Sequence, residues 1–274
     1  MTGCLVLVAT PIGNLGDLSP RAVEALRDAD EVWCEDTRRT RALLTHAGID
    51  GARLRSVREH NESQAASRLV DAILAGATIA YASDAGMPGI SDPGTRLVAA
   101  CVDVGLDVSI VPGPTAALSA LVLSGFPTDR FGFEGFLERK GPERNAAIDR
   151  IARSTATSIV YEAPNRIAAT IADLAAACGA DRRVAVAREI TKLHEEVVRG
   201  TLGDLGVVDG RGECVIVIEP AAPAPPADDA AIDGAIRAEL AAGASARDAA
   251  AAVADALGVA KRRAYERALA LKPR

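Results

Sequence analysis

Residues 83–94 read SDAGMPGISDPG and follow directly on the apolar run TIAYA at residues 78–82. The apolar run has the length and composition of a buried β-strand. The segment after it contains three glycines and two prolines, more than a plain turn requires. A segment with so few bulky side chains lets its backbone groups approach a bound molecule. Because open α/β sheets bind ligands beyond the carboxyl ends of their strands, we interpret residues 83–94 as a ligand-binding loop.

Short apolar segments alternate with amphipathic segments along most of the chain. The expected strands are residues 4–9, 32–34, 78–82, 108–111, 158–161, 184–187 and 214–219. The expected helices are residues 20–28, 64–74, 96–104 and 166–177. Nearly continuous apolar strands separated by helices are typical of sheets covered on both faces. The sequence therefore predicts an α/β fold.

Two breaks divide this pattern. The tripeptide PGP at residues 112–114 interrupts it sharply, and a Pro-, Ala- and Asp-rich stretch later in the chain is typical of a linker. Beyond the linker, SARD at residues 245–248 forms a capping box at the start of a helix. The predicted parts are an N-terminal α/β domain at residues 1–113, a C-terminal α/β domain at 114–220, a linker at 221–231 and a helical appendage at 232–274.

The composition excludes several classes of protein. The 274 residues are 49% hydrophobic, yet no apolar run reaches the roughly 18 residues that a membrane helix needs. The first residues lack the basic start of a signal peptide. The five cysteines are scattered, without a C-x-x-C pair or a Cys/His cluster. We therefore expect a cytoplasmic protein with reduced cysteines, no membrane partner and no metal site.

Charge is distributed unevenly along the chain. The net charge is −6, but from residue 232 onward eight Lys and Arg face five Asp and Glu, a local charge of +3 that leaves −9 on the rest. An acidic body with a basic tail is compatible with RNA binding. A solvated helix face gives the same count.

Further segments with unusual composition are expected to follow strands. Residues 10–18 (TPIGNLGDL) lack the glycine spacing of dinucleotide-binding and P-loop motifs. Residues 111–117 (VPGPTAA) open a helix, while EDTRRTR at 35–41 and EHNE at 59–62 are polar. Charge-rich loops are often merely solvated. Because parallel strands end along one edge of a sheet, we nevertheless expect these segments to gather beside residues 83–94.

Taken in order, these motifs resemble one family. The same order continues with YEAPNR at residues 161–166 and REITK at 188–192. The set resembles the tetrapyrrole methylase superfamily and, within it, the bacterial 16S rRNA 2′-O-ribose methyltransferases, over nearly the whole chain except the linker. The resemblance implies a two-domain, homodimeric methyltransferase with S-adenosylmethionine in the cleft between its domains. The implied substrate is the ribose 2′-hydroxyl of a cytidine in the decoding region of 16S rRNA, free or within the 30S subunit.

The resemblance also assigns residues to the cofactor by matching positions. They are Pro11, Ala85, Gly86, Met87, Ile90, Thr115, Ala116, Tyr161, Glu162 and Ile190. Related tetrapyrrole enzymes have a Gly-Gly-Asp-Pro turn where this chain has AGMP at residues 85–88, so the carboxylate of that turn is missing. Asp84 is a candidate substitute for it, and Asp92 is interpreted as part of an Asp-Pro-Gly turn.

Methyl transfer from a sulfonium needs no metal and no covalent nucleophile. Because a ribose hydroxyl is a poor nucleophile, a neighbouring base should accelerate the reaction by roughly 10²–10⁴-fold. The candidates are Glu35, Asp36, His60, Glu62 and, if burial lowers its pKa, Lys192. Phosphate contacts are expected from Arg38, Arg39 and Arg41 near the cleft and from Lys261, Arg262 and Arg263 in the tail.

Two other interpretations of the sequence stay open. One is a methyltransferase acting on a tetrapyrrole precursor. The basic tail and the arginine-rich loop argue against it, because a small anionic macrocycle needs no additional helical module. The other is a nucleotide- or RNA-binding module without catalysis, which would not bind S-adenosylmethionine.

Overall fold

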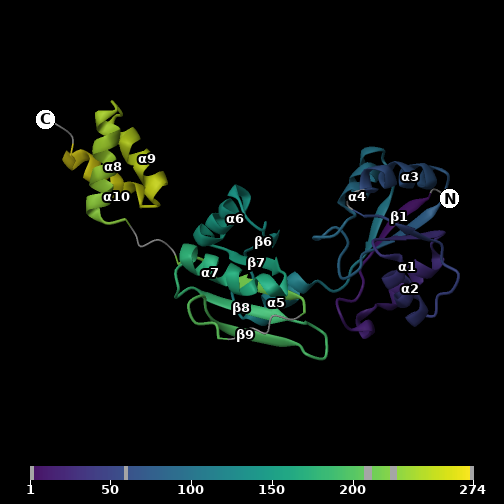
Figure 1. The fold of residues 1–274 in the computed structure, drawn as a ribbon. Helices are drawn as coiled ribbons and strands as arrows, with labels where there is room; N and C mark the ends of the chain where they lie inside the picture. Colours follow the sequence, from purple (N-terminus) through teal and green to yellow (C-terminus); the bar gives the residue numbers. More distant parts are fainter. Residues whose placement is uncertain (1–2, 59–60, 207–211, 223–226, 272–274) are drawn as a thin grey trace. The chain divides into compact units, whose positions relative to one another are not determined.

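The chain folds into two compact units, Met1–Ala221 and Ala222–Arg274 (Figure 1). The structure is a computed structural model that describes residues 3–58, 61–206, 212–222 and 227–271. The larger unit contains two five-stranded sheets. The described residues of the smaller unit form helices.

The first sheet is parallel throughout and has the strand order β3-β2-β4-β1-β5. Its strands are β1 (Cys4–Val8), β2 (Glu31–Cys34), β3 (Leu54–Ser56), β4 (Thr78–Ala82) and β5 (Val108–Val111). The register places Val8 beside both Ala82 and Val111, so the loops after β1, β4 and β5 begin side by side. The predicted strands are confirmed, and the short edge strand β3 adds to them.

Helices cover both faces of the first sheet, as the sequence predicts. They are α1 (Pro20–Asp28), α2 (Thr37–His46), α3 (Glu62–Leu74) and α4 (Thr95–Asp103), and the 3-10 helix η1 (Leu15–Asp17) precedes α1. Ile79 and Tyr81 of β4 pack with residues of α3 and α4, whereas Ala80 and Ala82 pack with residues of α1 and α2. Successive side chains of a strand point to opposite faces, so both faces of the central strand are buried.

The second sheet is mixed and has the order β6-β7-β10-β8-β9. Its strands are β6 (Phe131–Phe136), β7 (Thr157–Glu162), β8 (Arg183–Arg188), β9 (Glu196–Thr201) and β10 (Cys214–Ile218). Strand β6 runs parallel to β7, and the other neighbours are antiparallel. Strands β7, β8 and β10 confirm the prediction. Strands β6 and β9 add to it at the two edges, where partly exposed side chains weaken the apolar pattern.

Two layers of helices also cover the second sheet. The helices α6 (Pro142–Arg153) and α7 (Ile167–Cys178) pack on the face that contains Val160 and Ile216. Helix α5 (Ala116–Ser124) packs on the face that contains Ile159 and Val217. The predicted domain boundary at residues 113 and 114 falls between β5 and α5. Both sheets belong to one compact unit, so that boundary stays a prediction.

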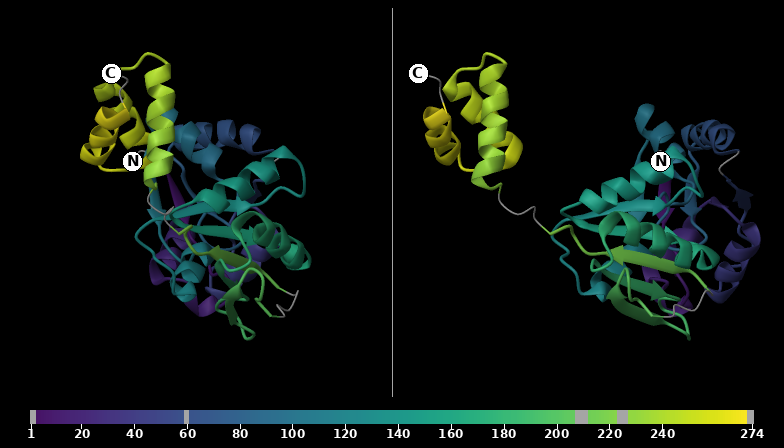
Figure 2. Two further views of the ribbon diagram at one scale, coloured as in Figure 1. Left: turned by 90° about the vertical axis from the view of Figure 1, so that its left-hand side faces the viewer. Right: turned by 60° about the vertical axis from the view of Figure 1, so that its left-hand side comes forward.

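The C-terminal unit is a three-helix group, coloured yellow-green to yellow in Figure 2. Its helices are α8 (Asp229–Ala241), α9 (Ala246–Leu257) and α10 (Lys261–Leu271), which share one apolar core. Asp228 caps α8 by accepting a hydrogen bond from the Ala231 N–H, so this helix begins within the range predicted to be linker. Ser245 caps α9 as predicted. Among the described residues no helix is both long and apolar enough to cross a membrane.

Candidate active site

A cavity of about 220 Å³ lies where loops of the two sheets meet in the larger unit. Most of its wall is apolar and includes Ile12, Met87, Ile90, Phe136, Tyr161 and Ile190. Three carboxylate residues, Asp92, Glu162 and Glu213, also contribute to it. A mostly apolar concave site with a few polar groups is typical of a small-molecule site.

The loop after β4 forms one wall of the cavity and is held by the segment that follows β1. Thr10 and Gly86 exchange two backbone hydrogen bonds of 3.0 and 3.1 Å, and the Ser83 hydroxyl donates to the Gly86 carbonyl at 2.7 Å. Gly86 has φ +85°, and a Cβ atom there would lie 3.1 Å from Ile12 Cγ2 and 3.2 Å from the Pro114 carbonyl. Glycine is therefore required both by the backbone conformation and by the close approach.

The start of α5 forms the neighbouring wall. Thr115 caps this helix by accepting a hydrogen bond from the Leu118 N–H at 3.2 Å. The Ala117 N–H donates to the Tyr161 hydroxyl at 3.1 Å, which ties the helix to the end of β7. The backbone and the tyrosine together fix the mouth of the cavity around Thr115 and Ala116.

Asp92, in the loop after β4, is the carboxylate of the cavity that differs most from an ordinary surface acid. Among the described residues, no hydrogen bond or ion pair joins its side chain to a partner. Burial, and after it the charges of Glu35, Asp84 and Glu213, together raise the pKa of Asp92 to about 7. A carboxylate that titrates near neutral pH beside a cavity is suited to accept a proton.

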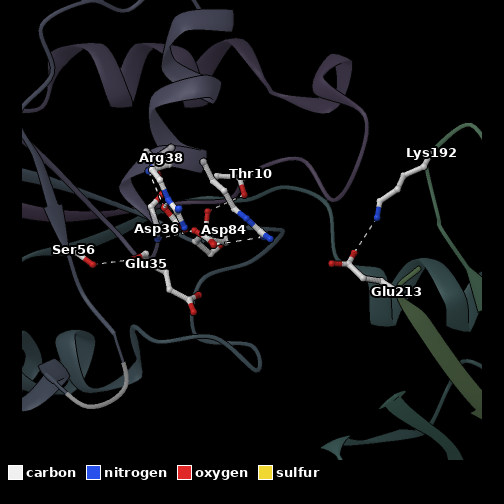
Figure 3. Close-up of polar contacts among 11 residues, drawn as sticks. Thr10, Glu35, Asp36, Arg38, Ser56, Asp84, Lys192 and Glu213 are labelled. Carbon is white, nitrogen blue, oxygen red and sulfur yellow. Dashed lines mark hydrogen bonds and ion pairs between the residues drawn. The ribbon is translucent and has the colours of Figure 1, made fainter. Parts of the chain in front are cut away.

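A second cavity, of about 270 Å³, lies between the loop after β1 and helix α2. Pro11, Arg39 and Asp84 contribute to it. Asp84 accepts a hydrogen bond from the Asp36 N–H at 3.0 Å and lies 3.6 Å from the Arg39 guanidinium. Asp84 thereby ties the start of α2 to the end of β4 (Figure 3).

Residues 4–206 match the sequence profile of the family described as Tetrapyrrole (Corrin/Porphyrin) Methylases. The chain belongs to the tetrapyrrole methylase family. It is a methyltransferase, and its methyl donor is S-adenosylmethionine.

Relatives and solved structures of this family cover most of the methylase chain. A Mycobacterium bovis protein named Ribosomal RNA small subunit methyltransferase I is 43% identical over 98% of this chain and 95% of its own. A Synechocystis protein of the same name is 50% identical over 73% of this chain and 71% of its own. The crystal structure of the methyltransferase CobJ shares the fold with a TM-score of 0.63 and 20% identity, over 80% of this chain and 95% of its own.

The residues of the first cavity fit the methyl donor of the methylase. Its apolar side chains suit the adenine ring, and the Glu213 carboxylate suits a cationic group of S-adenosylmethionine. Nine of the eleven residues predicted for the cofactor line this cavity: Ala85, Gly86, Met87, Ile90, Thr115, Ala116, Tyr161, Glu162 and Ile190. Their contact with the cofactor stays a prediction.

Three residues predicted for the cofactor have other surroundings or partners. Pro11 and Asp84 line the second cavity instead. Asp84 is thus a poor substitute for the missing carboxylate of the turn. Glu162 is only 2% exposed, and its carboxylate accepts hydrogen bonds from Thr170 Oγ1 at 2.6 Å and from the Ala163 N–H at 2.8 Å. It therefore secures the end of β7.

Glu35 and Asp36, the two adjacent acids predicted as bases, have different surroundings in the structure. Hydrogen bonds from the Arg38 side chain and backbone hold the pKa of Asp36 well below its usual range, and Asp36 caps α2. It is therefore poorly suited to accept a proton. The Glu35 carboxylate points away from Asp36 and Arg38 (Figure 3). Burial and the charge of Asp84 raise the pKa of Glu35.

Glu62 and Lys192 have structural partners that argue against their role as the base. Glu62 is 6% exposed, and its Oε1 accepts hydrogen bonds from the Gly94 N–H at 2.8 Å and the Arg96 N–H at 3.2 Å, at the start of α4. Burial lowers the pKa of Lys192, but hydrogen bonds and charges from Glu189 and Glu213 outweigh it and raise the pKa overall. The condition on which Lys192 is a candidate base, a pKa lowered by burial, is therefore not met. His60 lies outside the described residues.

Most of the cations predicted to bind RNA are already paired with acids. Arg38 lies 2.7 Å from Asp36, and Arg39 pairs with Asp84. In the tail the pairs are Lys261–Asp255 at 3.9 Å, Arg262–Glu266 at 2.9 Å and Arg263–Asp229 at 2.6 Å. The helical unit begins within the predicted linker and therefore includes Asp228 and Asp229 as well. Residues 222–274 hold eight basic and seven acidic residues, so the unit has a charge of +1 and not the +3 counted from residue 232. Arg41 is exposed.

From the sequence, Asp92 is interpreted as part of an Asp-Pro-Gly turn and is not counted among the site residues, although it lines the cavity. An Asp-Pro-Gly sequence is typical of a turn, and that pattern obscured its position in the wall. The available signal was the location itself, a carboxylate within a loop already interpreted as a ligand site. Its charged neighbours come from other loops, which the sequence does not place.

Proposed function

We propose that this methylase transfers the methyl group of S-adenosylmethionine to the ribose 2′-hydroxyl of a cytidine in the decoding region of 16S rRNA. The substrate is 16S rRNA, free or within the 30S subunit. Nine predicted cofactor residues around one cavity support the placement of the methyl donor.

The coverage of the relatives is the observation that supports this proposal most. The Mycobacterium bovis protein, whose name states a small-subunit rRNA activity, aligns with 98% of this chain. CobJ is aligned over 95% of its own length but leaves 20% of this chain unmatched. This chain therefore has residues beyond the part that aligns with CobJ, and the alignment with the Mycobacterium bovis relative includes nearly all of them. This additional part favours an RNA substrate over a tetrapyrrole.

The chemistry requires positioning and one proton acceptor. S-adenosylmethionine supplies an electrophilic methyl group, whose bond to sulfur breaks as the bond to the ribose oxygen forms. The walls formed by Gly86 and Thr115 hold the reactants in one geometry, an effect that can contribute about 7–11 kcal/mol. In the proposed role the Asp92 carboxylate accepts the proton that the 2′-hydroxyl loses.

Transfer of a radiolabelled methyl group tests the proposed substrate. The purified protein is incubated with labelled S-adenosylmethionine and either 30S subunits, free 16S rRNA or a tetrapyrrole precursor, and the RNA is digested to nucleosides. The expected product is 2′-O-methylcytidine from one of the RNA substrates. Label in a base would refute the ribose assignment, and label in the tetrapyrrole alone would favour the second candidate substrate. Calorimetry that detects no binding of S-adenosylmethionine would contradict every methyltransferase assignment.

Homodimer formation and a cytoplasmic location also remain proposals for this chain. Both come from the family resemblance and the composition described above. Sedimentation velocity at several protein concentrations measures the first. A single species with the mass of one 28.2 kDa chain would contradict it.

A further inference from the structure

Strand β6 exposes an unusual share of the few aromatic side chains in the protein. The sequence contains four phenylalanines, and three of them belong to β6. Phe131 is 46% exposed, Phe133 36% and Phe136 57%. Because burial of an aromatic ring is strongly favourable, three exposed rings on one strand indicate a surface with a partner.

A bulge places the three rings on one face of the sheet. Phe131 and Phe133 pair with Thr157 and Ile159 of β7, but the register then shifts, so Phe136 pairs with Tyr161. An uninterrupted strand would have turned Phe136 to the opposite face. Helix α5 packs on this face over Ile159, and its core cluster includes none of the three phenylalanines.

The aromatic row is continuous with the first cavity. The rings of Phe133 and Phe136 lie 4.9 and 5.4 Å from the ring of Tyr161, and Tyr161 and Phe136 both line the cavity. A Cβ atom on Gly135 would lie 3.5 Å from Ser91 Oγ, in the loop that forms the opposite wall. A molecule seated on the row therefore reaches the mouth of the site without a gap.

Exposed cations flank both ends of the row. Arg130 precedes Phe131, and Arg139 and Lys140 follow Phe136; all three are exposed. Among the described residues, no ion pair or hydrogen bond engages their side chains. Asp129 and Glu138 lie beside them in the sequence, so the surface has little excess positive charge. Stacking, more than charge, would then provide the affinity.

We propose that Phe131, Phe133 and Phe136 form an aromatic platform on which bases of single-stranded RNA next to the methylated nucleotide stack, an inference that rests on the proposed function. Sequence-specific RNA sites splay out unpaired bases and stack them on aromatic side chains, and two or three such side chains on a sheet suffice. The row spans about 16 Å at about 3.3 Å per residue, enough for this arrangement. A second copy of the chain over Phe136 would instead cover the mouth that must admit a ribose still attached to RNA.

Substitution of Phe131 tests the platform, because this ring does not line the cavity. Stacking contributes about 1–3 kcal/mol per base, so Phe131→Ala should raise the KM for the RNA substrate about 5- to 150-fold. The kcat and the Kd for S-adenosylmethionine should stay unchanged. Phe131→Tyr keeps a flat ring and should stay within about twofold of the wild type, whereas Phe131→Leu keeps apolar area without the ring and should resemble Phe131→Ala.

Val122→Ala is the matched control, since Val122 of α5 is 71% exposed and lies outside the platform. It should leave the KM for RNA unchanged. Equal KM values for Phe131→Ala and the wild type would overturn the platform, as would full activity of Phe131→Leu. A change from dimer to monomer in Phe131→Ala would show that this face binds a second copy instead. If the wild type methylates no rRNA, the proposed function fails; if the wild type and all variants methylate rRNA equally well, only the platform fails.

Discussion

Asp36 and Asp92 both follow strands of the first sheet, yet their surroundings give them opposite properties. The Arg38 side chain binds Asp36 through two hydrogen bonds, and the pKa of Asp36 is lowered. Asp92 has neighbouring acids instead of a bound cation, and burial together with the charges of those acids raises its pKa to about 7. A cation partner thus converts a candidate base into a structural cap, and the lack of one leaves a carboxylate able to take up a proton.

The largest expected effect comes from removing the Asp92 carboxylate, with the same change at Asp36 as the comparison. Asp92→Asn should lower kcat by roughly 10²–10⁴-fold, the usual contribution of a general base. Asp36→Asn should stay close to the wild type, because asparagine caps a helix as well as aspartate does. Single-turnover methylation of the RNA substrate measures both, with calorimetry to verify unchanged binding of S-adenosylmethionine. Comparable losses in the two variants would remove the contrast between these residues.

The pH dependence sharpens the same comparison. Asp92 must be ionised to accept a proton, so kcat should fall about tenfold per pH unit below pH 7. Glu35→Gln removes a negative charge that raises the pKa of Asp92, so the fall should begin at a lower pH. A Glu35→Gln variant that is inactive at every pH, with the fold retained by circular dichroism, would identify Glu35 as the base instead.

Substitution of Gly86, in the cavity wall formed by the loop after β4, should have an intermediate effect. Gly86→Ala forces a side chain into the left-handed region, at a cost of about 1–2 kcal/mol, and crowds Ile12 and Pro114. We expect the Kd for S-adenosylmethionine to rise about tenfold. Gly105→Ala is the matched control, since Gly105 has φ +72° with nothing within 4 Å of an added Cβ. It should lower the melting temperature but leave the Kd unchanged; equal Kd values in the two variants would argue against a role of Gly86 in the cavity wall.

The smallest expected effect concerns the tail, where the cations are paired with acids as Arg38 is. Simultaneous Lys261→Ala, Arg262→Ala and Arg263→Ala should raise the KM for the RNA substrate by less than about tenfold and reduce its salt dependence. Affinity for S-adenosylmethionine should not change. Arg237→Ala, in helix α8, is a control for charge alone. A triple variant whose KM and salt dependence match the wild type would show that the tail does not bind RNA.

Local patterns accounted for most of the fold. The strands β1, β2, β4, β5, β7, β8 and β10 are encoded by apolar runs, which identify strands buried on both faces. The same rule failed at the sheet edges. Strand β6 alternates phenylalanine with glycine and glutamate, and β9 is only partly buried, so neither forms a continuous apolar run.

The candidate site was accessible from the sequence to the extent that its walls are loops after strands. Gly86, Thr115 and Tyr161 each belong to a motif that can be read locally, and the structure brings them around one cavity. The partners of charged side chains could not be read in this way. Asp84 meets the backbone of Asp36 across 48 residues, and Lys192 meets Glu213 across 21.

The sequence by itself determined the α/β class, the family and the glycine-rich wall, because backbone preferences and apolar periodicity act over a few neighbouring residues. Only the tertiary structure decided which carboxylates have a lowered or a raised pKa and which face of β6 is exposed. A pKa depends on burial and on charges from distant segments, and the bulge in β6 exists only through its pairing with β7. Asp36 and Asp92 are the same amino acid, and their surroundings in the fold distinguish them.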